Sequence, residues 1–130
     1  VNPLQDTPNV ILTPHIAGST EEAQANIGLF VAGKLADYAE TGATVLSVNL
    51  PAVQAARPSG HRITHLHRNV PGVLAKLNTV LASHGTNIEG QTLATRGEVG
   101  YVVLDVAGDA DPGVIASLRD MPEAIRVEVR

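Results

Sequence analysis

Residues 61–81, HRITHLHRNVPGVLAKLNTVL, decide the fold, because a strand pattern, a turn and a helix pattern follow one another there. We expect a short strand near residues 63–67. Pro71 is expected at the first position of the helix that follows, with Gly72 beside it. Apolar residues then recur at three- and four-residue spacing, and we expect them to form the buried face of this helix: Val73, Leu74, Leu77, Val80 and Leu81.

Downstream of this stretch, the pattern continues with two strands, a short helix and a last strand. The expected elements are strands at 87–95 and 99–107 joined through Arg96-Gly97-Glu98, a helix at 114–118 capped by Asp111-Pro112, and a strand at 125–129. The order from residue 61 is βαββαβ, which predicts a ferredoxin-like α+β domain whose antiparallel sheet carries two helices on one face. Because no helix covers the other sheet face, we expect self-association.

Upstream, the pattern predicts a strand and a long helix. Residues 10–12 are aliphatic and end at a proline, which is typical of one buried strand. Ser19 and Glu22 have the spacing of a capping box at the start of a helix, and Gly42 is expected to end that helix. One apolar stripe runs along it, formed by Ala23, Ile27, Phe30, Val31, Leu35 and Tyr38.

Two glycines inside this helix, Gly28 and Gly33, indicate close packing against another backbone. Residues 45–50 predict a short strand, and the residues after them lack any periodicity. We therefore expect three parts: residues 1–50, a linker over residues 51–60 and a domain over residues 61–130.

Composition excludes several classes of function. The chain has 130 residues, 9 Lys and Arg against 13 Asp and Glu, and a net charge of −4 with no block of like charge, so we expect no nucleic-acid partner. It has no Cys, which excludes disulfides, thiolate catalysis and Cys-based zinc sites. No apolar stretch approaches the roughly 18 residues of a spanning helix, so we expect a cytoplasmic protein without a membrane partner.

Histidines are the first candidates for chemistry. His15 lies between a strand end and a helix start, where a proton-transferring side chain would face a ligand crevice. His61, His65 and His67 would share one face of a strand, but no carboxylate stands at a ligand-like spacing, so no metal site is expected. Arg62 and Arg68 are expected to be solvated.

An anion site is expected where the strand at 63–67 meets the following helix. Gly72 has no side chain, which leaves the free N–H groups at the helix start open to a carboxylate that the helix dipole also favours. His67 and Asn69 would supply polar side chains at the rim of this site.

The run PNVILTPHIAGST at residues 8–20, followed by Glu22-Ala23-Gln24, resembles the C-terminal signature of NAD-dependent D-2-hydroxyacid dehydrogenases, above all the D-3-phosphoglycerate dehydrogenases. The resemblance implies that His15 is the general acid and base, and that Ala17 and Gly18 flank the nicotinamide of NAD in the parent enzyme. No G-x-G-x-x-G motif follows a strand here, so the chain alone is expected to be inactive and to bind no cofactor. The chain begins with Val1, and we expect a piece of a longer protein.

The segment from His61 to Asp105 resembles the ACT domain of bacterial three-domain phosphoglycerate dehydrogenases. The resemblance implies L-serine as an effector that lowers activity, bound by His67 and Asn69 of one subunit and Asn87 of its neighbour, with Gly72 permitting close backbone approach. It further implies dimers in which the first strands of two ACT domains pair, and a tetramer in the parent enzyme. Ser59-Gly60 stands where that family often carries paired glycines, so we expect a slightly stiffer hinge.

Two other functions remain open. The chain could be the tail of a dehydrogenase acting on another D-2-hydroxyacid, because the substrate-anchoring residues would lie outside it. Alternatively, it is a free-standing ACT-type amino-acid sensor or dimerisation module that carries a remnant of a dehydrogenase.

Overall fold

The computed structural model describes residues 3–58 and 60–130, so the expectation for Ser59 lies outside the described residues. The described chain forms two compact units, one up to Gly33 and one over Lys34–Arg130. The elements are α1 (Glu21–Thr41), β1 (His61–Arg68), α2 (Val73–Ser83), β2 (Ile88–Arg96), β3 (Val99–Val106), α3 (Pro112–Arg119) and β4 (Ala124–Val129).

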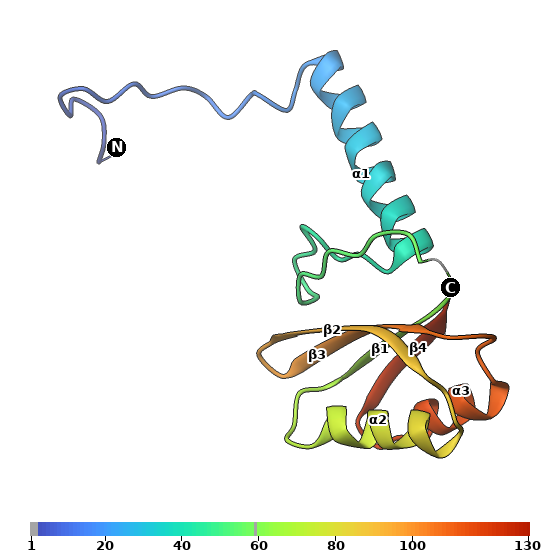
Figure 1. The fold of residues 1–130 in the computed structure, drawn as a ribbon. Coiled ribbons are helices and arrows are strands. Elements are labelled where there is room, and N and C mark those ends of the chain that lie inside the picture. Colours follow the sequence, from blue (N-terminus) through green and yellow to red (C-terminus); the bar gives the residue numbers. More distant parts are fainter. Residues whose placement is uncertain (1–2, 59) are drawn as a thin grey trace. The chain divides into compact units, whose positions relative to one another are not determined.

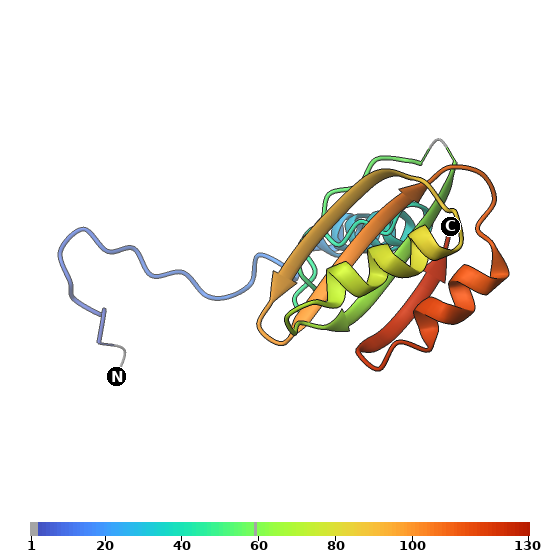
Figure 2. The ribbon, with the colours of Figure 1, turned by 60° about the horizontal axis from the view of Figure 1, so that its bottom comes forward.

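The four strands form one antiparallel sheet in the order β2-β3-β1-β4. Helices α2 and α3 lie side by side on one face of this sheet, as Figure 1 and Figure 2 show. The order of elements from β1 to β4 confirms the predicted βαββαβ arrangement and the α+β fold.

The place of β1 contradicts the expectation that the first strands of two copies pair edge to edge. β1 pairs with β3 over residues 61–68 and with β4 over residues 63–67, so both sides of its backbone are used within the sheet. In the described chain, the two strands with an open edge are β2 and β4. A second copy could extend the sheet only at one of these two edges.

The main core lies between the sheet and its two helices. The predicted apolar face of α2 is confirmed, with Val73, Leu77 and Leu81 buried and Leu74 and Val80 packed at the border. The remaining core residues come from the inner face of the sheet, from α3 and from the connection between α3 and β4: Ile63, Val102, Leu104, Val106, Val114, Ile115, Leu118, Met121 and Val127.

The segment between α1 and β1 covers part of the opposite face. Val53 is buried against Tyr101 and Val103 of β3. Thr44 holds the segment in place, because its backbone N donates to the carbonyl of Val53 at 2.9 Å and its hydroxyl donates to that of Pro51. The predicted strand at residues 45–50 is wrong: these residues form turns, with Ser47 N donating to the carbonyl of Thr44 at 3.0 Å, and they join no sheet in the described chain.

Helix α1 begins one residue later than the predicted capping box implies. Thr20, and not Ser19, caps it, with the Thr20 hydroxyl accepting from the backbone N of Ala23 at 3.1 Å. Its end at Gly42 is confirmed by a left-handed φ of 73° there. A Cβ at Gly28 or Gly33 would meet no described atom within 4 Å, so the predicted close packing is absent from the described chain.

The apolar stripe of α1 is largely uncovered in the described residues; Ile27, Phe30, Val31 and Leu35 are all exposed. Residues 10–12 are exposed as well and form no strand, which contradicts the predicted buried strand. The physical reason is that a strand needs a neighbour for its backbone groups, and no described segment pairs with these residues. No helix among the described residues is both long enough and apolar enough to cross a membrane.

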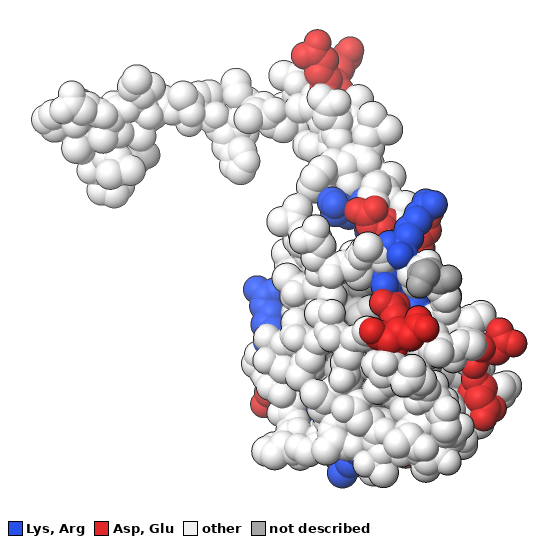
Figure 3. Space-filling model, in the orientation of Figure 1, with Lys and Arg blue, Asp and Glu red and all other residues white. Residues whose placement is uncertain are grey.

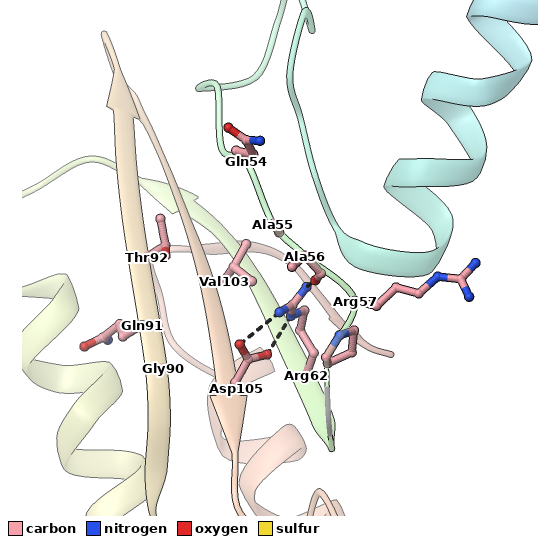
Figure 4. A pocket seen from close by; sticks show the side chains of 11 residues that line it. Gln54, Ala55, Ala56, Arg57, Arg62, Gly90, Gln91, Thr92, Val103 and Asp105 are labelled. Atoms are coloured by element: carbon pink, nitrogen blue, oxygen red, sulfur yellow. Dashed lines mark hydrogen bonds and ion pairs between the residues drawn. The ribbon is translucent and has the colours of Figure 1, made fainter.

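Arg62 is buried, at 4% exposure, which contradicts the expectation that it is solvated. Its Nε and Nη2 donate to the two carboxylate oxygens of Asp105 at 2.7 and 2.9 Å (Figure 4). Its Nη1 donates to the carbonyls of Thr41, at 2.8 Å, and Ala56. One side chain of β1 thus joins the C-terminal end of α1, the segment before β1 and strand β3.

His65 and His67 lie on the helix-covered face of the sheet, at 0% and 3% exposure. Their Nδ1 atoms are 3.3 Å apart, and Nε2 of His65 is 3.3 Å from the carbonyl of Leu118. Because a carbonyl only accepts, His65 Nε2 carries a proton, and His67 Nδ1 donates to the bare Nδ1 of His65. Burial lowers the pKa of both imidazoles below 6.5.

The two buried histidines predict that stability falls on mild acidification. In the unfolded chain, both titrate near 6.5, whereas the folded protein keeps them neutral to lower pH, so the unfolded state binds more protons below pH 6.5. We expect the free energy of unfolding by urea to fall between pH 7.5 and 5.5, by up to about 1.4 kcal/mol per pH unit for each imidazole. His65→Gln should flatten this slope, and the exposed His61→Gln should keep it. A wild-type value constant over this range would contradict the assignment.

The Arg62 interactions predict a large cost for removing their carboxylate. Asp105→Ala leaves a buried guanidinium without its ion-pair partner, and since Asp105 itself is 34% exposed we expect a loss of about 2–3 kcal/mol, which lowers Tm by about 10 °C or more. Asp109→Ala is the matched control, because that carboxylate is fully exposed and, among the described residues, pairs with His61 alone. Equal melting temperatures for both variants would show that Arg62 does not depend on Asp105.

Candidate functional site

Three of the four predicted effector residues meet where β1 leads into α2. Helix α2 begins at Val73, so Pro71 precedes it and the expectation of Pro71 at the first helical position is wrong. Gly72 is the N-cap instead, with a left-handed φ of 87° that other residues rarely adopt and no side chain to cap the helix. A Cβ at Gly72 would meet no atom within 4 Å, so the start of α2 is open. Its first N–H groups lack helical acceptors and can meet an anion.

Asn69 is exposed and ties this junction to the β2–β3 turn. Its backbone N donates to the carbonyl of Glu98 at 2.8 Å, and its side-chain Nδ2 donates to that of Gly97 at 3.0 Å. Its Oδ1 accepts no hydrogen bond in the described chain, so an acceptor oxygen remains beside the start of α2.

His67 lies in the core and not at the rim of the site, where the sequence placed it. Period-two alternation along β1 puts its ring on the face that α2 and α3 cover. It is accommodated because residue 100 is glycine: a Cβ there would clash with His67 Nε2. The His67 ring can contact a ligand only if the loop that covers the ring moves or the ligand displaces that loop.

Asn87 is exposed and lies at the opposite end of the sheet. It precedes β2, and its carbonyl accepts from the backbone N of Ala107 at 3.0 Å. At one end of the sheet, Ile88 of β2 and His61 of β1 both pair with Val106 of β3. At the other end, Arg96 of β2 and Arg68 of β1 both pair with Val99 of β3. One chain therefore brings together His67, Asn69 and Gly72 but leaves Asn87 apart from them.

A charged pair at the same junction was not predicted from the sequence. Lys76, in the second turn of α2, pairs through Nζ with Oε1 of Glu123, just before β4. The Glu123 backbone carbonyl accepts from Arg68 N at 2.9 Å, which fixes the residue beside the end of β1. The hydrogen bond from Lys76 lowers the pKa of the Glu123 carboxyl. Lys76 and Glu123 are 47 residues apart, and no local spacing connects them.

His15, Ala17 and Gly18 lie in the unit up to Gly33. His15 and Ala17 are exposed, and Gly18, whose carbonyl accepts from the side chain of Gln24, is half-buried. His15 has no hydrogen bond or ion pair within the described residues. No G-x-G-x-x-G turn accompanies these residues in the sequence, so they alone do not fit NAD.

A cavity of about 300 Å³ lies on the sheet face opposite α2 and α3 (Figure 4). The Arg62–Asp105 pair forms part of its wall, together with Gln54, Thr92 and Val103. None of the predicted site residues lines this cavity.

The histidines and the charged side chains of the described chain are spread over several elements. No group of three or more His, Asp or Glu side chains there is arranged to hold a metal ion. His61 points to Asp109, with Nε2 and Oδ1 3.0 Å apart, and does not join His65 and His67. On the face in Figure 3, acidic and basic side chains are interspersed, and no broad basic surface is visible.

Comparisons with known proteins agree with this architecture. Residues 63–126 match the family described as the AHAS small subunit-like ACT domain. The chain is 45% identical over 130 residues to the D-3-phosphoglycerate dehydrogenase of Escherichia coli K12, and 46% over 131 residues to that of Haemophilus influenzae. The protein of the same name from Dictyostelium discoideum is 42% identical over 127 residues.

These matches cover 98%, 99% and 97% of this chain but 32%, 32% and 31% of the relatives, so the chain spans about a third of their length. Among solved structures, the regulatory subunit of aspartate kinase from Thermus thermophilus is similar over 54% of this chain and 49% of that one, with 18% identity and a TM-score of 0.48. The chain is therefore related to the C-terminal part of the D-3-phosphoglycerate dehydrogenases, and it carries an ACT domain at residues 63–126.

Proposed function

We propose that this chain is the regulatory part of an NAD-dependent D-3-phosphoglycerate dehydrogenase of L-serine biosynthesis, and that its ACT domain binds L-serine as a feedback inhibitor. The observation that carries the proposal is the similarity of 98% of the chain to proteins of that name. The open start of α2 beside Asn69 supports an amino-acid ligand.

An amino acid is a zwitterion, and the junction of β1 and α2 offers a partner for each end. Its carboxylate would accept from the free N–H groups after Gly72, where the helix dipole favours negative charge. Asn69 Oδ1 would accept from the ligand's ammonium or hydroxyl group. His67, buried below Asn69, would be reached as the ligand displaces the loop.

The position of Asn87 supports a site shared by two copies joined at β2. An antiparallel pair of β2 strands related by a two-fold axis places the start of one strand beside the end of the other. The end of β2 leads to Gly97 and Glu98, which contact Asn69. Asn87 of a second copy would therefore lie beside Asn69 of the first, whereas pairing at β4 would keep them apart.

A ligand held by two copies gives a physical basis for regulation. L-serine would bind more tightly to the arrangement in which Asn69 and Asn87 of different copies are close, and it would shift the population toward that arrangement. In the parent enzyme, His15 would transfer the proton during interconversion of hydroxyl and ketone. Ala17 and Gly18 would lie beside the cofactor, which supplies hydride transfer and which other parts of the longer protein would hold.

Titration calorimetry of the 130-residue chain tests the effector. We expect heat and a raised Tm with L-serine and much weaker responses with glycine, L-alanine and L-valine. Asn87→Ala should weaken binding about tenfold, because it removes a hydrogen bond to a charged ligand. The exposed Asn26→Ala is the matched control and should bind as the wild type does. A folded chain without a response to any of these amino acids would contradict the proposal.

A mixing experiment tests whether the site is shared. Asn69→Ala and Asn87→Ala chains should each bind L-serine weakly alone. When they are unfolded together and refolded, each mixed dimer regains one site with both asparagines, so about a quarter of all sites should recover wild-type affinity. Circular dichroism should show native folding for each variant. Absence of any high-affinity fraction in a sample proved to contain mixed dimers would show that the site lies within one chain.

A further inference from the structure

Glu123 carries the one buried side-chain oxygen without a hydrogen-bond partner in the described chain, Oε2. A buried acceptor that has lost its water without gaining a donor destabilises the folded chain. Such an atom calls for an explanation, and a donor that arrives with a ligand is one.

The neighbouring donors are already engaged. Lys76 Nζ pairs with the other carboxylate oxygen, Oε1. The Arg68 guanidinium donates to the carbonyl of Pro122 at 3.1 Å, and its backbone N donates to the Glu123 carbonyl. His67 is near enough for its ring to feel the Glu123 charge, but its Nδ1 proton points to His65. The titratable groups around Oε2 are therefore the cations Lys76 and Arg68 and the neutral His67, and none of them donates to it.

The exposure of the pair shows how a ligand would reach this oxygen. The Glu123 side chain is 14% exposed, whereas the Lys76 side chain is 57% exposed and forms the outer member of the pair. Lys76 is a flexible side chain at the surface, so it can swing aside at little cost. This movement uncovers the Glu123 carboxylate, which lies just before β4 and beside Lys76 of α2, near the helix start proposed to hold the ligand's carboxylate.

We propose that Glu123 is a ligand-contacting residue that accepts the ammonium group of the amino acid bound at the start of α2, and so selects amino acids over hydroxy acids. The inference rests on the proposed function and names a group within the same site. The ammonium donates to Oε2, while Lys76 stays within reach of the ligand's carboxylate. Each charged end of the zwitterion thus meets a protein group of the opposite charge: the ammonium meets Glu123, and the carboxylate meets Lys76.

L-Glycerate provides a sharp probe, because it equals L-serine with the ammonium replaced by a hydroxyl group. We expect the wild-type chain to prefer L-serine over L-glycerate by at least tenfold in titration calorimetry. Glu123→Gln should weaken the binding of L-serine at least tenfold and leave the affinity for L-glycerate nearly unchanged. The preference for L-serine over L-glycerate should therefore disappear. Glu123→Asp, which keeps the charge, should restore part of it.

Glu98→Gln is the matched control, because Glu98 is exposed on the adjacent turn and contacts Asn69 only through its backbone. It should keep wild-type affinity and preference. If Glu123→Gln keeps both the affinity for L-serine and the preference over L-glycerate, the role of Glu123 is overturned while L-serine binding stands. If the wild type binds no amino acid, the proposed function itself fails, and this inference fails with it.

Discussion

The guanidinium of Arg62 carries a full positive charge that is almost entirely shielded from water, and its surroundings are arranged to compensate that charge. Asp105 supplies a two-point ion pair from β3, and the carbonyls of Thr41 and Ala56 supply the rest. These carbonyls fix the end of α1 and the segment that covers the outer sheet face. The Arg130 side chain adds to this junction by donating to the carbonyls of Tyr38 and Ala39, both at 3.1 Å. Within the expected linker, Val53 and Ala56 are thus held against the sheet.

The ferredoxin-like part could be predicted because each of its elements carries its own signals. The Pro71-Gly72 turn, the Gly97 hairpin and the Asp111 cap each mark a boundary by local chemistry. Residues 10–12 and 45–50 show the limit of this reasoning, since an aliphatic run is a strand only where a neighbour accepts its hydrogen bonds. Arg62 was misjudged for a related reason: its burial depends on carbonyls 21 and six residues away and on a carboxylate 43 residues away.

The candidate site could be predicted only in part for the same reason. Gly72 and Asn69 stand in one short loop, and the sequence alone brings them together. The burial of His67 follows from alternation along β1, a signal that was available, although the expectation of an anion site at the helix start placed this residue at the rim. Glu123 is brought to Lys76 by the antiparallel pairing of β4 with β1, which only the three-dimensional structure shows. The open edge at β2 likewise depends on strand order and not on any residue pattern.

Because His67 and Gly100 are in contact, the residue that can stand at one of these positions depends on the residue at the other. The imidazole fills the volume that a side chain at position 100 would occupy, so no larger residue fits there while the histidine remains. Loss of the imidazole would open that volume and allow alanine or a larger residue to replace the glycine. Among related ACT domains, a histidine at the position of His67 should therefore be accompanied by a glycine at the position of Gly100. A larger residue at the glycine position should mark domains that recognise their ligands without this histidine.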